Sequence, residues 1–176
     1  MNRAVFLDRD GVINRTHIRE RKPYPPIGLS EIEILPGVAQ ALLALRKAGF
    51  LLIVVTNQPD VARGSTSREA VEEINNHLAS RLAIDEIYTC FHDNKDGCDC
   101  RKPLPGSLLA AAKKHRIDLK ASYMVGDRWR DIEAGQRAGC KTIFIDYMYT
   151  EKQPELFDYR VSSLLEASQI ILGDQK

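Results

Sequence analysis

The chain has 176 residues, of which 25 are Lys or Arg and 24 are Asp or Glu, so its formal net charge at pH 7 is +1. This balance excludes a general electrostatic attraction to nucleic acid or to a membrane surface. The length is sufficient for one domain with its own core, and we expect a single domain over residues 1–176.

The apolar stretches of the sequence, such as Phe50 to Val55, are as long as β-strands and too short to cross a bilayer. Met1 to Arg3 leads directly into the first apolar run without the features of a signal peptide. We therefore expect a cytoplasmic protein that binds neither nucleic acid nor a membrane, and we expect it to be a monomer.

A short buried strand is predicted from Val5 to Leu7, and it ends in Asp8-Arg9-Asp10-Gly11. Alternation along a strand places Asp8 and Asp10 on the same side, with Arg9 turned away. Open α/β sheets bind ligands at the carboxyl ends of their strands, so the two acids are expected to face a crevice. Two neighbouring carboxylates repel each other, and a divalent cation relieves that repulsion. An acidic turn without a ligand is the alternative.

Residues 14–30 form a long polar segment that contains the stiff run Pro23-Tyr24-Pro25-Pro26, which excludes a helix or a central strand. Its position just after the acidic pair predicts a loop that forms a wall of the crevice. Its positive charge favours an anionic substrate group, and a solvated basic loop is the alternative. The charge comes from Arg15, Arg19, Arg21 and Lys22, and the segment also contains His17.

A helix is predicted from Val38, after Pro36-Gly37, to Gly49, and Phe50 to Val55 is predicted to be a central parallel strand. This strand ends in Thr56-Asn57-Gln58, which offers a hydroxyl and two amides at the same edge of the sheet as the acids. Neutral donors can hold phosphoryl oxygens without cancelling the charge of a nucleophile. An ordinary polar loop is the alternative.

Thr66-Ser67-Arg68-Glu69 matches a capping box and predicts a helix that continues to Leu82, followed by a strand from Ile84 to Phe91. Three cysteines and one histidine in a short loop are a standard ligand set for structural zinc and leave no open position for catalysis. We expect a zinc knuckle, with redox-active or free cysteines as the alternative. The expected ligands are Cys90, His92, Cys98 and Cys100.

Arg101-Lys102-Pro103 follows the knuckle directly, so bound zinc would fix the direction of two adjacent cations. An ammonium can bridge a carboxylate and a phosphoryl oxygen, and a guanidinium can bind a phosphate or sugar hydroxyls. Two exposed charges ahead of a helix are the alternative. That helix is predicted from Pro105 to about His115.

The stretch from Tyr123 to Asp127 repeats the opening pattern, so Asp127 is a third carboxylate at the carboxyl end of a strand. Asp131 follows in the first turn of a helix that ends at Gly139, where it either braces the site or is simply a favourable first-turn acid. The remaining predictions are a strand at Lys141–Ile145, an irregular segment at Tyr147–Asp158, an edge strand at Tyr159–Val161 and a last helix from Ser162 to about Leu172.

Four motifs resemble those of the haloacid dehalogenase superfamily phosphatases and occur in the order of that family. They are Asp8-Arg9-Asp10-Gly11, Thr56-Asn57, Lys102, and Gly126-Asp127 with Asp131. The knuckle with its following cations resembles a narrower branch, the heptose bisphosphate and histidinol phosphate phosphatases. The family fold is a Rossmann-like, doubly wound parallel α/β sheet, and the alternation of predicted strands and helices agrees with it. The resemblance implies a zinc knuckle loop and no separate cap domain.

The resemblance also implies a magnesium-dependent phosphomonoesterase. In this mechanism Asp8 attacks phosphorus to form an aspartyl phosphate, while Asp10 protonates the leaving alkoxide and then activates water. Mg²⁺ would be held by Asp8, Asp10, through its backbone carbonyl, and Asp127. Thr56, Arg101 and Lys102 complete the expected catalytic set. The expected substrate-binding residues are Thr16, His17, Arg19, Asn57, Gln58, Arg101, Lys102 and Arg128.

Within this branch, the positive charge of Arg15, Arg19, Arg21, Lys22 and Arg101 favours a heptose bisphosphate, whereas the ammonium of histidinol phosphate would require carboxylates. The resemblance to the heptose bisphosphate phosphatases then implies removal of the 7-phosphate from a heptose 1,7-bisphosphate. Two features depart from the heptose branch. Pro59-Asp60 stands where that branch commonly has Ser-Gly, and the gap in the knuckle is short, as in histidinol phosphate phosphatases. Histidinol phosphate and other phosphorylated sugars therefore stay open as substrates. The same motifs are also compatible with a phosphotransferase, and the knuckle with a zinc-stabilised binding module that has no turnover.

Overall fold

The computed structural model describes residues 1–175. The strands are β1 (Arg3–Leu7), β2 (His17–Arg19), β3 (Lys22–Tyr24), β4 (Phe50–Asn57), β5 (Glu86–Cys90), β6 (Tyr123–Gly126), β7 (Lys141–Ile145) and β8 (Tyr159–Val161). The α-helices are α1 (Val38–Lys47), α2 (Arg68–Arg81), α3 (Gly106–His115), α4 (Trp129–Ala138) and α5 (Leu164–Gly173). Short 3-10 helices are η1 (Leu29–Glu31), η2 (Asn94–Asp96) and η3 (Leu119–Ala121).

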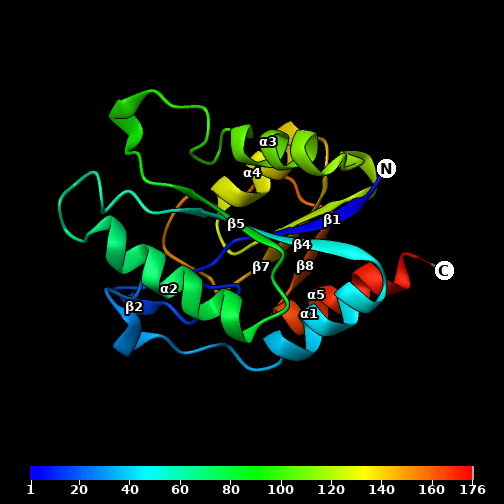
Figure 1. Cartoon of the computed structure of the whole chain (residues 1–176), viewed down its shortest axis with the longest axis horizontal. Helices are drawn as coiled ribbons and strands as arrows, with labels where there is room; N and C mark the ends of the chain where they lie inside the picture. The colour runs from blue at the N-terminus through cyan, green and yellow to red at the C-terminus, as the bar shows by residue number, and fades with distance from the viewer. Residues whose placement is uncertain (176) are drawn as a thin grey trace.

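Six strands form one sheet in the order β5-β4-β1-β6-β7-β8, and every neighbouring pair is parallel. Helices cover both of its faces: α3 and α4 lie on one, and α1, α2 and α5 on the other (Figure 1). Along β1, Val5 and Leu7 enter the core beside α1 and α5, whereas Ala4 and Phe6 enter the core beside α3. Burial on both faces explains the continuous apolar run of this strand.

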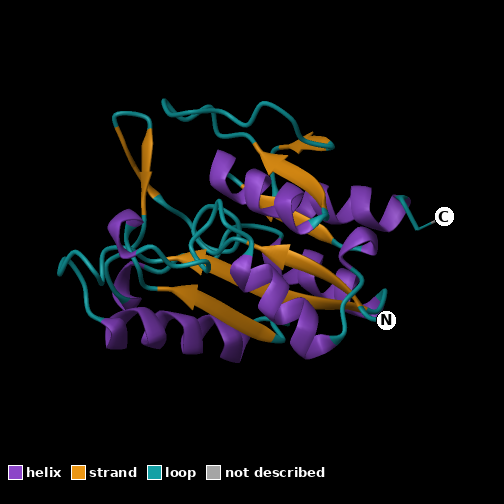
Figure 2. Ribbon diagram, turned by 90° about the horizontal axis from the view of Figure 1, so that it is seen from above, coloured by secondary structure: helices purple, strands orange, loops and turns teal. Residues whose placement is uncertain are grey.

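The direction of winding reverses at β1. The chain passes from β1 to β4 and outward to β5, then returns to β6 on the other side of β1 and continues to β7 and β8. The loops after β1 and β6 therefore diverge and open a crevice at the carboxyl ends of the strands. Figure 2 shows the strand arrowheads pointing toward the side where the long loops gather. The predicted doubly wound parallel sheet is confirmed, and no separate cap domain occurs within residues 1–175.

The segment 14–30 is more ordered than the predicted loop. Strands β2 and β3 pair as an antiparallel hairpin that stands away from the main sheet (Figure 2). Its turn residues Glu20 and Arg21 have φ values of 50° and 59°, the left-handed conformation that a two-residue hairpin turn requires. Pro23 is compatible with this hairpin because each of the two strands is an edge strand. The exclusion of a central strand was correct, but the hairpin was missed.

Several predicted boundaries differ from the structure by a few residues. The N-cap of α2 is Ser67 rather than Thr66, since the Ser67 hydroxyl accepts a hydrogen bond from the backbone N–H of Ala70 at 3.1 Å. Strand β5 begins at Glu86 and ends at Cys90, so it is shorter than predicted at both ends. Within residues 1–175, none of the helices combines the length and the apolar character needed to cross a membrane.

Candidate active site

A small cavity lies at the carboxyl ends of β1, β4 and β6, where the loops that follow these strands meet. Its volume is about 160 Å³, and its walls include Asp8, Asp10, Lys102, Asp127 and Asp131. The structure thus brings together, at one point, acids and a cation that come from three distant parts of the sequence.

Lys102 lies enclosed between two of these acids. Its Nζ atom lies 2.8 Å from Oδ1 of Asp8 and 2.6 Å from Oδ1 of Asp131, and it donates to the carbonyl oxygen of Val55 at 2.6 Å. Burial alone disfavours the ammonium, but the charges of Asp131 and Asp8 outweigh it and raise the pKa of Lys102 above its ordinary value. Lys102 is therefore a fixed positive charge beside Asp8.

Asp131 fulfils both of the roles considered from its position in the sequence. Besides its contact with Lys102, its Oδ2 atom accepts a hydrogen bond from the backbone N–H of Arg128 at 3.0 Å, which caps the first turn of α4. Asp131 is only 2% exposed, and its carboxylate holds Lys102 in the site from the first turn of the helix.

The carboxylates of Asp8, Asp127 and Asp131 offer oxygens that lie within 4.8 Å of one another. Burial and then the neighbouring negative charges raise the pKa of Asp8 to about 6 and that of Asp127 well above its ordinary value. The Oδ1 atom of Asp127 is buried and has no hydrogen-bond partner in the described part of the chain. Crowded carboxylates with an unpaired oxygen are a suitable donor set for a hard divalent cation, so these residues fit Mg²⁺.

Gly11 allows the first and third acidic loops to approach each other. Its φ is +89°, and a Cβ atom at this position would overlap the Oδ2 atom of Asp127. Any other residue would therefore be strained and would displace Asp127 from the cavity.

The Asp10 carboxylate is held by three side chains. Arg9 donates to both of its oxygens at 3.1 Å, Asn14 donates to Oδ1 at 3.0 Å, and Gln58 donates to Oδ2 at 2.8 Å. Arg9 lies outside the cavity wall, as expected, but it is fully buried and also donates to Oδ1 of Asn75. The alternation rule missed this contact because it applies only to extended chain, and β1 ends before Asp10.

The three polar residues after β4 are arranged differently from one another. Asn57 lines the cavity and exchanges two hydrogen bonds with the backbone of Lys102, at 3.0 and 3.1 Å, so it positions the lysine. Thr56 is 1% exposed, and its hydroxyl oxygen accepts a hydrogen bond from Gln58 at 2.9 Å. Thr56 and Gln58 lie behind the cavity wall rather than in it, and Gln58 reaches the site through Asp10.

The segment around the hairpin forms a wall of the cavity, as predicted, through Thr16, Pro23 and Pro25. The structure does not bring the expected substrate-binding residues His17 and Arg19 to this wall. The Nε2 atom of His17 lies 3.0 Å from Glu31, and the guanidinium of Arg19 lies 5.6 Å from the centre of the Tyr24 ring. Arg15 and Arg21 line a separate cavity behind the hairpin.

Three further arginines supply positive charge at the cavity: Arg63 from the loop after β4, Arg128 at the N-cap of α4, and Arg130 in its first turn. Arg63 is paired with Asp60 and Asp93, and Arg128 is paired with Glu151. The Arg130 guanidinium lies 4.5 Å from the centre of the Trp129 ring. The sequence analysis identified Arg128 but missed Arg63 and Arg130. The position of Arg130 directly before Asp131 was the available signal.

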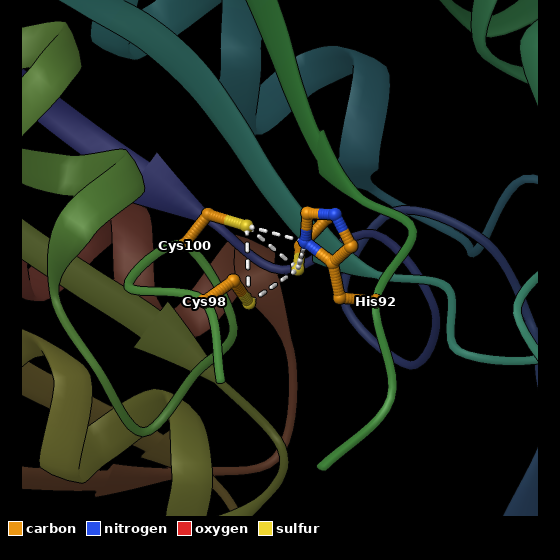
Figure 3. Close-up of side chains that lie close together, drawn as sticks. His92, Cys98 and Cys100 are labelled. Carbon is orange, nitrogen blue, oxygen red and sulfur yellow. Dashed lines mark hydrogen bonds between the residues drawn. The ribbon is translucent and has the colours of Figure 1, made fainter. Parts of the chain in front are cut away.

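The four predicted zinc ligands form one cluster. His92, Cys98 and Cys100 turn toward one another in Figure 3. The Sγ atom of Cys98 lies 3.7 Å from that of Cys90 and 3.5 Å from that of Cys100, while Cys90 and Cys100 are closer, at 2.8 Å. The Nδ1 atom of His92 lies 3.4 Å from the Cys100 sulfur. Two sulfurs bound to a tetrahedral zinc at about 2.3 Å lie about 3.8 Å apart. The two distances from the Cys98 sulfur are close to this value, whereas Cys90 and Cys100 would have to move apart to bind the same ion.

Arg101 and Lys102 leave the knuckle in different directions. Arg101 folds back onto the knuckle, where it donates to Oδ1 of Asn94 at 2.9 Å and to the carbonyl oxygen of His92 at 3.4 Å. It lines a second cavity of about 230 Å³, which shares Lys102 and Arg130 with the first. Arg101 therefore lies beside the acidic cavity rather than in its wall.

Comparison with known proteins agrees with this geometry. The D-glycero-beta-D-manno-heptose-1,7-bisphosphate 7-phosphatase of Escherichia coli (strain K12) is 36% identical to the chain over 188 residues, which cover 98% of this chain and 95% of that relative. The protein of the same name from Pasteurella multocida (strain Pm70) is 34% identical over 187 residues, covering 98% of both chains.

A solved structure shares the whole architecture. The crystal structure of D,D-heptose 1.7-bisphosphate phosphatase from B. bronchiseptica, complexed with magnesium and phosphate, has a TM-score of 0.81 and 28% identity over 98% of this chain and 99% of that chain. The family model for haloacid dehalogenase-like hydrolases matches residues 15–139, which include the lysine and the third and fourth acids of the cavity. Given this match and the relatives that align over almost their full length, the chain belongs to the haloacid dehalogenase-like hydrolase family.

Proposed function

We propose that this protein is a magnesium-dependent phosphomonoesterase, a single domain over residues 1–176, that removes the 7-phosphate from D-glycero-D-manno-heptose 1,7-bisphosphate. The observation that carries the proposal is the convergence of Asp8, Lys102 and Asp127 on one buried cavity. A chain that only bound a phosphorylated ligand would have no use for three crowded acids around a lysine. The relatives that align over nearly the whole chain carry the name of this phosphatase.

In the proposed reaction Asp8 is the nucleophile. Its carboxylate oxygen forms a bond to phosphorus while the bond from phosphorus to the sugar oxygen breaks, and Asp10 gives its proton to the leaving alkoxide. In the second step Asp10 takes a proton from water as the water oxygen attacks phosphorus, which releases phosphate and restores the Asp8 carboxylate. The contacts of Asp10 with Arg9 and Gln58 orient its carboxyl group for both proton transfers.

Mg²⁺ would be held by Asp8, the backbone carbonyl of Asp10 and Asp127, and when bound it would neutralise charge on the transferring phosphoryl group. The residues of the chain supply the remainder of the positive charge. Lys102 holds Asp8 through Oδ1 and lines the same cavity, so its positive charge can stabilise the negative charge that develops on the phosphoryl group. Asn57 holds the lysine in place through its backbone.

The arginines at the rim support a substrate with a second phosphate. Arg130 and Arg128 lie at the cavity on the side of α4, and Arg63 lies at the cavity after β4. Asp60 also lines the cavity, and a carboxylate there favours the ammonium of histidinol phosphate as an alternative. Since Asp60 lies 3.3 Å from Arg63, much of its charge is already matched, and the bisphosphate is the better fit.

We further propose that Cys90, His92, Cys98 and Cys100 bind one structural Zn²⁺. All four protein positions around a tetrahedral ion would be filled, so this ion would hold the loop rather than take part in the reaction. The loop in turn fixes the backbone from which Lys102 reaches the acids, because Lys102 is only two residues after Cys100.

The proposal is tested by phosphate release from a panel of heptose 1,7-bisphosphate, fructose 1,6-bisphosphate and histidinol phosphate in excess Mg²⁺. We expect the highest kcat/KM with the heptose bisphosphate. An Asp8→Asn variant, which loses the charge with little change in volume, is the matched control and should be folded but inactive. A preference for histidinol phosphate would overturn the substrate, and tight binding without phosphate release would support a binding module instead.

A further inference from the structure

Tyr149 contacts the acidic cavity from a segment that carries none of the family motifs. It lies in the irregular stretch after β7, and its hydroxyl donates to Oδ2 of Asp127 at 2.8 Å. Both side chains are buried, with Tyr149 7% exposed and Asp127 1% exposed. Since water cannot reach this contact freely, the hydroxyl is a fixed partner of that carboxylate oxygen.

The two oxygens of Asp127 are therefore not equivalent. Oδ2 is occupied by Tyr149, whereas Oδ1 is buried without a partner in residues 1–175. The Asp127 carboxylate also contributes an oxygen to the cluster with Asp8 and Asp131. A carboxylate with one oxygen anchored presents the other in a single direction. Groups that anchor a metal ligand in this way commonly govern the affinity of the site.

Tyr149 is itself held firmly. Its ring stacks on that of Tyr147, with centroids 5.5 Å apart, and the Tyr147 hydroxyl donates to the carbonyl oxygen of Gly11 at 2.9 Å. The backbone N–H of Thr150 donates to the carbonyl oxygen of Arg21 in the hairpin at 2.9 Å. Residues 147–150, here called the tyrosine segment, are thus tied both to the turn after Asp10 and to the hairpin.

We propose that Tyr149 is a positioning residue that fixes the Asp127 carboxylate for a small divalent cation and so favours Mg²⁺ over Ca²⁺. Mg²⁺ requires near-ideal octahedral geometry, whereas Ca²⁺ accepts variable coordination and bidentate carboxylates. A carboxylate that is free to rotate therefore harms Mg²⁺ binding more than Ca²⁺ binding. This inference rests on the proposed function only in taking Asp127 as a metal ligand.

The test is isothermal titration calorimetry of Mg²⁺ and of Ca²⁺ into the substrate-free enzyme and its Tyr149→Phe variant. We expect the Kd for Mg²⁺ to rise roughly 10- to 100-fold in the variant, and the Kd for Ca²⁺ to rise less. Tyr159→Phe is the matched control, because it also removes a tyrosine hydroxyl that donates to a carboxylate, that of Asp174 at 3.0 Å, but outside the cavity. Both affinities should be unchanged in the control.

An unchanged Kd for Mg²⁺ in Tyr149→Phe would overturn the proposal, and so would equal losses for the two cations, which indicate general damage to the site. Tyr147→Phe keeps the Tyr149 hydroxyl but releases the segment from Gly11, so it should weaken Mg²⁺ binding less than Tyr149→Phe does. If Tyr149→Phe does not fold, Tyr147→Phe is the deciding variant, because an unchanged Kd for Mg²⁺ in Tyr147→Phe would then refute the proposal. Because no substrate is present, failure of the heptose assignment would leave these affinities unaltered.

Discussion

The Nζ atom of Lys102 lies 2.8 Å from Oδ1 of Asp8, although 94 positions separate the two residues in the sequence. Both side chains are buried, and Asp131 contacts the same ammonium from the first turn of α4. Asp8, the nucleophile of the proposed reaction, is thus held by the buried ammonium of Lys102 before any substrate binds.

Replacing Lys102 by methionine should harm both activity and stability. It leaves Asp8 and Asp131 as buried acids without a cation, which costs about 3–5 kcal/mol of unfolding free energy. It also removes the positive charge beside the phosphoryl group, which lowers kcat by roughly 100-fold or more. Urea denaturation and phosphate release measure the two effects. Lys141→Met is the control, because Lys141 makes an exposed pair with Asp174 and should cost below about 1 kcal/mol. A loss as small as that of the control would contradict the role of Lys102.

Arg9→Lys should lower kcat about tenfold or more while leaving KM nearly unchanged. Lysine keeps the positive charge but cannot donate to both oxygens of Asp10 at once, so the proposed acid–base group loses its orientation. Steady-state kinetics with matched thermal melts separate this effect from unfolding. Arg68→Lys, in an exposed pair with Glu72, should behave as wild type, and an equally active Arg9→Lys would show that the contact has no part in turnover.

Metal analysis of the purified protein should find one zinc ion per chain. Cys98→Ser should lose that ion, melt at lower temperature and lose much of its activity, because the loop that precedes Lys102 would no longer be held. Cys140→Ala should keep the zinc, since Cys140 is buried away from the cluster. Protein that is fully active and contains no zinc would refute the zinc site.

The response to Mg²⁺ should depend on pH. Burial raises the pKa of Asp8 to about 6, whereas the unfolded chain titrates near its ordinary value of about 4, so the metal-free folded protein holds more protons between these values. The contribution of Asp8 to the free energy of unfolding therefore falls as the pH rises through this window. Below the pKa of Asp8, a cation must displace a proton in order to bind. We expect calorimetry to show a larger rise in melting temperature with Mg²⁺ at about pH 7.5 than at about pH 5. Equal rises would contradict the raised pKa.

Arg130→Met should raise KM for the sugar bisphosphate about tenfold, the value of one charge-assisted hydrogen bond, with little change in kcat. KM for a sugar monophosphate that lacks the second phosphate should change much less. Arg137→Met, on the exposed side of the same helix and paired with Glu133, is the control. An equal rise for both substrates would show that Arg130 does not recognise the second phosphate.

Asp8, Asp10 and Asp127 could be predicted because each follows a short apolar strand, and parallel strands present their carboxyl ends at one edge of the sheet. The knuckle was predictable from ligand spacing for the same local reason. Side-chain direction in irregular segments was not predictable. His17 and Arg19 were chosen by charge alone, and their partners Glu31 and Tyr24 hold them outside the cavity. Tyr149 lies in a stretch without periodicity, where no pattern links it to Asp127.

The overlap that any Cβ atom at Gly11 would create with Asp127 has a consequence for the evolution of this enzyme. The loops after β1 and β6 meet at Gly11, which has no side chain that substitution could make smaller. We therefore expect new substrate preferences to arise by substitution in the β2–β3 hairpin or at Arg63, Arg128 and Arg130. Position 11 itself should tolerate no replacement in any selection for activity.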